Sequence, residues 1–229
     1  MAEKQIELVV NCAAYTAVDK AEDNQELCAK LNSEAVGYLA KAAEENQAEF
    51  IQISTDYVFD GTNYVPYRET EPTCPNSVYG VTKLAGEKKA LEYCSKAMII
   101  RTAWLYSVFG NNFVKTMIRL GKERESLGVI FDQIGTPTYA RDLASAVFAA
   151  IRKGIIPGIY HFSNEGVCSW YDFTKSIHRI AGIGNCKVSP LHTDEYPAKA
   201  PRPHYSVLDK TKIKHTYGIE IPHWEESLE

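Results

Sequence analysis

The sequence predicts an α/β fold in which helices cover both faces of a parallel sheet, followed by a smaller C-terminal α/β lobe. Two observations predict the sheet: short apolar runs typical of buried strands, and intervening segments whose apolar residues repeat at helical spacing. A third observation predicts the lobe, because the strands become shorter and prolines more frequent from Gly158 onward. We therefore expect one division of the chain, between residues 1–157 and 158–229.

Each element follows from a local pattern. The first strand is expected at 6–10, a mostly apolar run. The first long helix is expected at about 26–46, because Leu27, Leu31 and Leu39 recur at spacings that place them on one helix face. In chain order, the further elements expected are the strand 50–53, the helix 77–94, the strand 97–100, the helix 112–122, the strand 128–131, the helix 140–153, the strand 159–162 and the helix 170–181.

Composition and charge exclude several classes of protein. Hydrophobic residues make up 45% and charged residues 24% of the 229 residues, values typical of a globular protein with a packed core. Acidic residues outnumber basic residues by 29 to 25, so no broad positive field is available to bind nucleic acid. No apolar run approaches the roughly 20 residues that cross a membrane, and the N-terminus does not resemble a signal peptide, so we expect a cytoplasmic protein. The histidines lack the spacing of metal ligands, and no metal site is expected.

A tyrosine and a lysine four residues apart, Tyr79 and Lys83, give the clearest chemical signal. On a helix this spacing places both side chains on one face. A nearby ammonium favours the phenolate and lowers the phenol pKa from about 10 toward the range in which a proton donor works. Such pairs are common on helices, but Ser54 and Thr55 end the preceding strand, and we expect their hydroxyls at the same sheet edge. Together these residues predict acid–base chemistry at a carbonyl group.

A set of longer motifs is more specific than this pair. The motifs are NCAAYTAVDKAE at 11–22, STDYVFDG at 54–61, PNSVYGVTKLAGE at 75–87, RTAWLY at 101–106, DQIGTPT at 132–138 and, in the lobe, Arg202-Pro203 followed by SVLD at 206–209. On these motifs the chain resembles the dTDP-4-dehydrorhamnose reductases, a family of the extended short-chain dehydrogenase/reductase superfamily. The likeness runs from about Leu8 to Trp224.

The resemblance implies a Rossmann-like domain over residues 1–157, which binds NADPH or NADH and contributes to the substrate site, and a mainly substrate-binding lobe over 158–229. It implies that Tyr79 donates a proton, that Lys83 holds the nicotinamide ribose and tunes Tyr79, and that Thr55 lies beside the substrate carbonyl. The other positions that it implies are Ala14, Tyr15 and Thr16 beneath the cofactor, Ile53 near the nicotinamide, and Asp56 and Trp104 at the sugar.

Several of these positions also have ordinary structural explanations. Tyr15 and Trp104 are as compatible with a core aromatic as with a ligand contact, and Asp56 with a carboxylate that caps a loop. Arg202 is a candidate partner for a nucleotide diphosphate, because a guanidinium matches two phosphate oxygens, but a structural salt bridge explains it equally.

The chain departs from the family before Leu8, where no strand and glycine-rich turn seat a pyrophosphate. The resemblance implies that about fifty residues of the cofactor half-site are missing, on the scale of one and a half βαβ units. We expect either a fragment of a full reductase or, less favoured, a shortened relative that has lost cofactor binding. Weak or absent NAD(P)H binding and an exposed sheet edge that promotes homo-oligomers are the expected consequences.

We therefore expect an NAD(P)H-dependent reductase that converts the C4 ketone of dTDP-4-dehydro-L-rhamnose to the alcohol of dTDP-L-rhamnose, a precursor of cell-surface polysaccharide. One alternative is a nucleotide-sugar epimerase or dehydratase of the same superfamily, which shares Tyr79 and Lys83. Another is a non-catalytic regulatory subunit like that of methionine adenosyltransferase. Retention of Thr55, Tyr79 and Lys83 favours the reductase.

Overall fold

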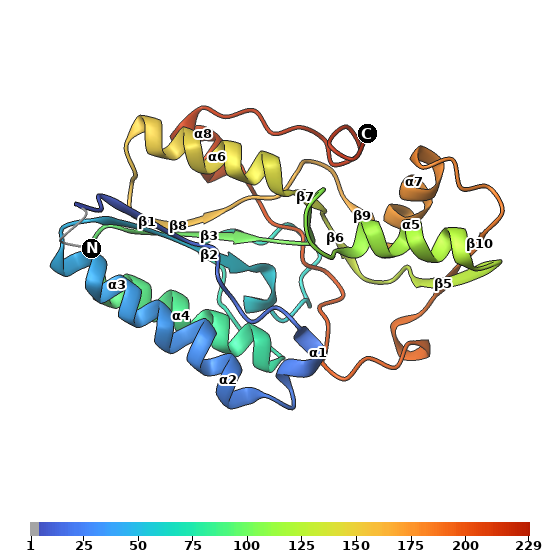
Figure 1. Cartoon of the computed structure of the whole chain (residues 1–229), viewed down its shortest axis with the longest axis horizontal. Helices are drawn as coiled ribbons and strands as arrows, with labels where there is room; N and C mark the ends of the chain where they lie inside the picture. The colour runs from blue at the N-terminus through green and yellow to red at the C-terminus, as the bar shows by residue number, and fades with distance from the viewer. Residues whose placement is uncertain (1–4) are drawn as a thin grey trace.

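Four parallel strands form the central sheet of the protein, which a computed structural model describes over residues 5–229 (Figure 1). Across the sheet they are β1 (Leu8–Asn11), β2 (Glu49–Thr55), β3 (Ala97–Thr102) and β8 (Gly158–His161). Each neighbouring pair runs parallel. Every residue of β3 is buried, because helices cover both faces of the sheet. The predicted fold class is confirmed.

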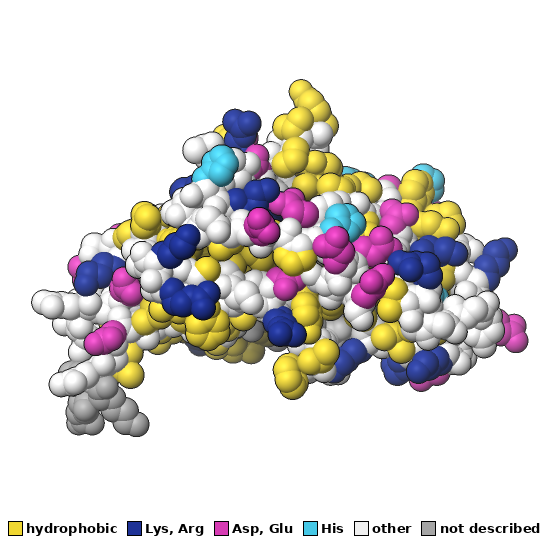
Figure 2. All heavy atoms as spheres, turned by 90° about the horizontal axis from the view of Figure 1, so that it is seen from above, with side chains coloured by type: hydrophobic (Ala, Val, Ile, Leu, Met, Phe, Trp, Pro, Cys, Tyr) yellow, Lys and Arg dark blue, Asp and Glu magenta, His cyan; other side chains and the backbone are white. Residues whose placement is uncertain are grey.

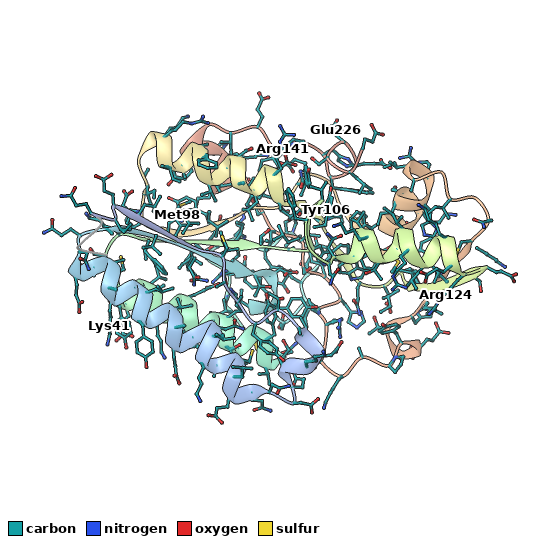
Figure 3. The ribbon with its side chains drawn as sticks, viewed as in Figure 1. Lys41, Met98, Tyr106, Arg124, Arg141 and Glu226 are labelled. Atoms are coloured by element: carbon teal, nitrogen blue, oxygen red, sulfur yellow. The ribbon has the colours of Figure 1, made fainter. Side chains whose placement is uncertain are left out.

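Helices pack on each face of this sheet (Figure 1). On one face lie α3 (Ala35–Glu45) and α4 (Val78–Tyr93), and on the other lie α6 (Ala140–Lys153) and α8 (Thr211–Tyr217). Met98 lies in the sheet layer (Figure 3) and belongs to the apolar cluster beneath α6. The clusters that join the sheet to the two helix layers contain Val36, Ala40, Phe50, Ala90 and Ile99 on one side, and Ile51, Ile100, Val147, Tyr160 and Tyr217 on the other.

The helix expected at 26–46 is not continuous. It comprises α2 (Gln25–Ala29), a π-helical turn (Lys30–Glu34) and α3, and the short α1 (Val18–Ala21) precedes it. Asn32 in the π-turn is 1% exposed, and its side-chain amide makes two hydrogen bonds with the Tyr15 backbone. Its Oδ1 accepts from Tyr15 N at 2.8 Å, and its Nδ2 donates to the Tyr15 carbonyl oxygen at 3.1 Å. A Cβ at Gly86 of α4 would lie 2.1 Å from the Asn32 carbonyl oxygen, so only glycine permits this approach.

A second group of elements packs beside the sheet. It contains α5 (Phe113–Glu123), α7 (Trp170–Ile180) and the parallel pair β5 (Ser126–Ile130) and β10 (Lys187–Leu191). Their shared core contains Met117, Leu127, Val129, Phe173, Ile177 and Val188. The sequence did not predict β10, because Pro190 interrupts its pattern; a two-stranded sheet has a free edge on which proline is tolerated.

Short strands and turns join the sheet to this group. The antiparallel pair is β6 (Ile134–Gly135) with β9 (Cys168–Ser169), and the parallel pair is β4 (Leu105–Tyr106) with β7 (Thr138–Tyr139). Two 3₁₀ turns, η3 (Asp56–Val58) and η4 (Thr193–Glu195), complete the elements in the described part of the chain. Tyr106 lies where the two groups meet (Figure 3).

The packing does not follow a single division at residue 157. β8 and α8 come from the range 158–229 but complete the sheet domain, whereas α5 and β5 come from the first range and build the lobe. Two neighbouring strands can run parallel only if the chain between them is long enough to return to the same end of the sheet. Each group therefore pairs strands that are distant in sequence, and the chain passes between the groups more than once. Which range binds substrate stays a prediction.

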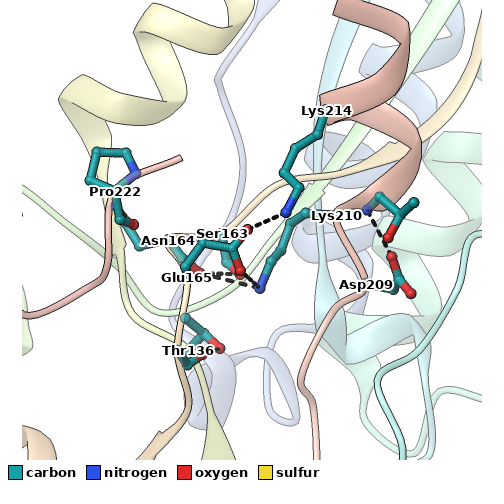
Figure 4. A network of polar contacts seen from close by, with 10 residues as sticks. Thr136, Ser163, Asn164, Glu165, Asp209, Lys210, Lys214 and Pro222 are labelled. Atoms are coloured by element: carbon teal, nitrogen blue, oxygen red, sulfur yellow. Dashed lines mark hydrogen bonds and ion pairs between the residues drawn. The ribbon is translucent and has the colours of Figure 1, made fainter. Parts of the chain in front are cut away.

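Ion pairs tie the segment that follows β8 to α8 (Figure 4). The Glu165 carboxylate accepts from Lys214 Nζ at 2.7 Å and lies 3.3 Å from Lys210 Nζ. On the outer surface, basic and acidic side chains are interspersed over the face seen in Figure 2. None of the helices that residues 5–229 form has the length and apolar character that crossing a bilayer requires.

Candidate active site

The carboxyl end of β2 carries the first site residues. Thr55 is 3% exposed and pairs in register with Thr102 of β3. Its hydroxyl accepts from the Tyr57 backbone N–H at 3.2 Å, which starts the 3₁₀ turn η3, and donates to Asp56 Oδ1 at 3.1 Å. The strand end therefore turns sharply and holds its hydroxyl at the sheet edge.

The start of α4 packs directly against this turn. The Ser77 side chain caps the helix by accepting from Gly80 N at 3.2 Å. A Cβ at Gly80 would lie 2.3 Å from the Tyr57 carbonyl oxygen, so glycine is required for the approach. The Tyr57 and Tyr79 rings meet edge to face at 5.5 Å, which places Tyr79 against the turn that Thr55 begins.

Lys83 lies one turn further along α4 and is 5% exposed. Its Nζ donates to the Ile53 carbonyl oxygen at 2.6 Å. Burial lowers the pKa of Lys83 to about 8, and the nearby Glu87 carboxylate acts in the opposite direction. The structure therefore brings Ile53, Thr55, Tyr79 and Lys83 to one sheet edge.

The lowered pKa expected for Tyr79 is not found. Burial raises the pKa of the Tyr79 phenol to about 12, although the contact with Thr55 partly opposes this shift. Within residues 5–229, the only hydrogen bond of the Lys83 ammonium goes to the Ile53 backbone and not to the phenol. The arrangement keeps the proton on Tyr79 at neutral pH, which is the state that a proton donor requires.

A buried ion pair lies beneath the site, and the sequence did not predict it. Glu87 of α4 and Arg101 of β3 are paired at 2.7 Å, with side chains 1% and 3% exposed. Ser54 also donates to Glu87, and Arg101 lies 3.5 Å from the His161 ring. Burial lowers the pKa of His161 to about 3, and the Arg101 charge adds to that effect. The spacing of Tyr79, Lys83 and Glu87, four residues apart on one helix face, was the available signal.

Asp56 is a buried carboxyl group beside Thr55. It is 2% exposed, and its Oδ2 has no hydrogen-bond partner in the part of the chain that the structure describes. Burial raises the pKa of Asp56 to about 6, while contacts with Ser206 and Thr55 partly oppose the shift. A buried carboxyl with an unpaired oxygen is a candidate ligand contact.

The loop that contains Ala14, Tyr15 and Thr16 follows β1 at the same sheet edge. The Asn32 side chain fixes its backbone at Tyr15 and also donates to Thr82 at 3.2 Å, so the loop is tied to α4. The sequence analysis missed Asn32, because a polar residue within a predicted helix gave no sign that the helix would widen there.

A cavity of about 340 Å³ adjoins Tyr57 on the lobe side of the site. Its lining combines aromatic and aliphatic side chains with a single charged residue, Arg202, and Tyr57 joins it to Tyr79. Trp104 does not line this cavity but stacks at 3.5 Å on Trp170, which does. The lining residues are Tyr57, Phe113, Met117, Gly128, Val129, Ile130, Gln133, Trp170, Tyr196 and Arg202.

Arg202 also forms an ion pair that spans the two groups of elements. Its guanidinium donates to both carboxylate oxygens of Asp19 in α1, at 2.9 and 2.7 Å. Both explanations considered for Arg202 are thus open, since the residue pairs with an acid and also lines a cavity. Across residues 5–229, no group of three or more acidic, histidine or cysteine side chains is arranged to hold a metal ion.

Comparison with known proteins agrees with this geometry. A family model for the RmlD substrate binding domain matches residues 1–229. The dTDP-4-dehydrorhamnose reductase of Escherichia coli (strain K12) is 45% identical over 228 residues, which cover 96% of this chain and 76% of that relative.

Two solved structures of the same family are also closely similar. A dTDP-4-dehydrorhamnose reductase from Clostridium acetobutylicum ATCC 824 is 48% identical with a TM-score of 0.96, over 99% of this chain and 80% of that chain. The reductase from Bacillus anthracis str. Ames, solved in complex with NADP, is 42% identical with a TM-score of 0.95 over the same shares. The chain therefore belongs to the family of the RmlD substrate binding domain, the dTDP-4-dehydrorhamnose reductases.

Proposed function

We propose that this chain reduces the C4 ketone of dTDP-4-dehydro-L-rhamnose to the alcohol of dTDP-L-rhamnose, with NADPH as the hydride source. One observation carries the proposal: Tyr79 and Lys83 of α4 lie against the end of β2 that carries Thr55, next to the cavity that Tyr57 lines. Family membership supports the reaction, because several relatives at over 40% identity are named dTDP-4-dehydrorhamnose reductases.

Tyr79 is the proton donor in this proposal. The reaction adds a hydride to the carbonyl carbon and a proton to its oxygen, so the oxygen must face an acidic group. Because the pKa of Tyr79 is raised to about 12, the phenol carries its proton at neutral pH. Thr55 is proposed to donate a second hydrogen bond to the same carbonyl oxygen and so to orient the ketone.

Lys83 and the loop from Ala14 to Thr16 fit a nicotinamide cofactor. An ammonium has three N–H donors, and within residues 5–229 Lys83 uses one of them, on the Ile53 carbonyl, so two are available for ribose hydroxyls. When bound, the cofactor supplies the hydride. The NADP complex of the Bacillus anthracis relative supports NADPH over NADH.

The cavity of about 340 Å³ fits the nucleotide part of the substrate. Its aromatic and aliphatic lining provides stacking and apolar surface for a base, while Arg202 provides the positive charge that a diphosphate requires. Asp56 and Trp104 are proposed to act on the sugar side, Asp56 through its unpaired oxygen and Trp104 by supporting Trp170.

The proposal is tested by following NADPH consumption with dTDP-4-dehydro-L-rhamnose, at NADPH concentrations raised until the rate no longer increases. Tyr79→Phe is expected to lower kcat by about 100-fold to 10,000-fold, the usual effect of losing a general acid. Tyr64→Phe is the matched control, because Tyr64 is 88% exposed and is not among the residues assigned to the site. Full activity of Tyr79→Phe, or no sugar-dependent NADPH consumption at NADPH concentrations at which the wild-type chain binds the cofactor, would refute the proposal.

A further inference from the structure

The segment around Arg202 is fastened to α1 by one acidic residue. Asp19 accepts two hydrogen bonds from the Arg202 guanidinium, at 2.9 and 2.7 Å, and further bonds from the backbone N–H groups of Lys199 at 3.1 Å and Ala200 at 3.0 Å. These contacts join residues 180 to 183 positions apart in the chain. The Arg202 hydrogen bonds lower the pKa of Asp19 to about 2, so the carboxylate is ionised at neutral pH.

The guanidinium has donors left over after this pairing. A guanidinium carries five N–H groups in a rigid plane. Nη1 donates to Asp19 and to the Ala200 carbonyl oxygen at 3.0 Å, and Nη2 donates once, to Asp19. Within residues 5–229, no acceptor is bound to Nε or to the second N–H of Nη2. These two N–H groups form the side edge of the fork, which is one of the geometries that binds two oxygens of a phosphate.

The free edge belongs to a residue that lines the cavity. Arg202 and Tyr57 share that cavity, whereas Asp19 is not among its lining residues. Asp19 therefore holds the guanidinium from outside and leaves it accessible from the cavity side. An arginine side chain has several rotatable bonds, and fixing one end of its fork reduces the entropy lost when a ligand binds the other edge.

We propose that Asp19 is a positioning residue for substrate binding: it holds Arg202 so that the Nε and Nη2 edge of the guanidinium binds the diphosphate of the nucleotide sugar. This inference rests on the proposed function, which assigns the nucleotide to this cavity. Asp19 itself touches neither the substrate nor the reacting atoms, and its contribution is to binding and not to proton or hydride transfer.

The test compares binding of dTDP and of thymidine to the whole chain, because only dTDP carries the diphosphate. Arg202→Ala is expected to weaken dTDP binding by about 10-fold to 100-fold, the range for charge-assisted hydrogen bonds, and to leave thymidine binding unchanged. Asp19→Asn is expected to weaken dTDP binding by about 5-fold to 10-fold, again without effect on thymidine. In the reductase assay, Asp19→Asn should raise KM for the sugar nucleotide and change kcat by less than about twofold.

Asp23→Asn is the matched control, because Asp23 pairs with Lys199 and fastens the same segment without touching Arg202. It should change dTDP binding by less than about twofold if positioning of the guanidinium is what matters. Asp19→Glu should recover part of the dTDP affinity that Asp19→Asn loses, since it restores the carboxylate.

The outcomes separate this inference from the proposed function. Equal effects of Asp19→Asn and Asp23→Asn on dTDP binding would mean that Asp19 only fastens the segment and does not position the guanidinium. Unchanged or tighter dTDP binding by Asp19→Asn would mean that Asp19 does not help Arg202 to bind the diphosphate. Either result overturns the inference. If Arg202→Ala leaves dTDP binding unchanged, or the wild-type chain binds neither compound, the assignment of the cavity in the proposed function fails instead.

Discussion

Two carboxylate–guanidinium pairs lie among the elements that form the site, and they differ in their contact with water. The Glu87 and Arg101 side chains are 1% and 3% exposed and lie inside the sheet layer. The Asp19 and Arg202 side chains are 45% and 20% exposed and lie at the junction with the lobe. Both pairs have double hydrogen bonds between the two groups, but Arg101 donates through Nε and Nη2, whereas Arg202 donates through Nη1 and Nη2.

Their remaining hydrogen-bonding partners show what each pair can do. Around Glu87 and Arg101, the other contacts come from Ser54 and from the His161 ring, all within the core. Arg202, by contrast, keeps two N–H groups without an acceptor in the described residues and lines a cavity. The buried pair is therefore suited to fixing α4 against β3, and the exposed pair to binding a ligand.

The largest expected effect comes from breaking the buried pair. Glu87→Gln leaves the Arg101 charge without its partner in a dry environment, so the free energy of unfolding should fall by about 3–5 kcal/mol. Arg101→Met should have a loss of similar size, because it leaves the Glu87 carboxylate unpaired. Chemical denaturation followed by circular dichroism measures both values.

The double variant Glu87→Met/Arg101→Met sharpens this prediction. Removing both charges avoids an isolated buried ion, so the double variant should recover most of the stability that each single variant loses. Losses that simply add in the double variant, or a single variant within about 1 kcal/mol of wild type, would contradict the interpretation of this pair as a desolvated unit.

A smaller, pH-dependent effect is expected at Asp56, the buried carboxyl that forms no ion pair within residues 5–229. Its folded-state pKa of about 6 lies above its ordinary value of 3.8, so it favours the folded state most at low pH, and this advantage is lost as pH rises through 6. Asp56→Asn removes this cost. At pH 8 the free energy of unfolding of this variant should be about 2 kcal/mol higher than that of the wild type, and the difference should vanish near pH 4.

The difference between variant and wild type is the quantity to measure, because His161 acts in the opposite direction. Its pKa is lowered to about 3, so its contribution falls as pH decreases below its ordinary value of 6.5. Asp60→Asn is a suitable control, since hydrogen bonds from Thr62 lower the pKa of Asp60 and no stabilisation at high pH is expected. If the difference in free energy of unfolding between Asp56→Asn and wild type does not change with pH, the pKa of Asp56 is not raised in the folded protein.

The sequence predicted the parts of the fold that depend on local patterns. Continuous apolar runs predicted β2 and β3, and the pattern at 77–94 predicted α4, so the sheet edge with Thr55, Tyr79 and Lys83 could be anticipated. The π-turn at Asn32 could not, because it depends on a contact with the Tyr15 backbone and on the close approach of a neighbouring helix.

The long-range ion pairs could not be predicted from the sequence for a related reason. Glu87 and Arg101 are 14 positions apart and Asp19 and Arg202 are 183 apart, and neither spacing carries a periodic signal. The direction of the Tyr79 pKa shift was also missed, because burial of the phenol depends on the packing of Tyr57 and η3, which no local pattern specifies.

The smallest expected effect on stability comes from breaking the exposed pair. Asp19→Asn should lower the free energy of unfolding by less than about 1 kcal/mol, because water screens both charges and the asparagine oxygen can still accept the Lys199 and Ala200 N–H groups. The same denaturation experiment measures it, beside Glu87→Gln. A loss above about 2 kcal/mol, comparable with the buried pair, would show that Asp19 holds the fold together and that weaker dTDP binding by this variant reflects a disrupted structure.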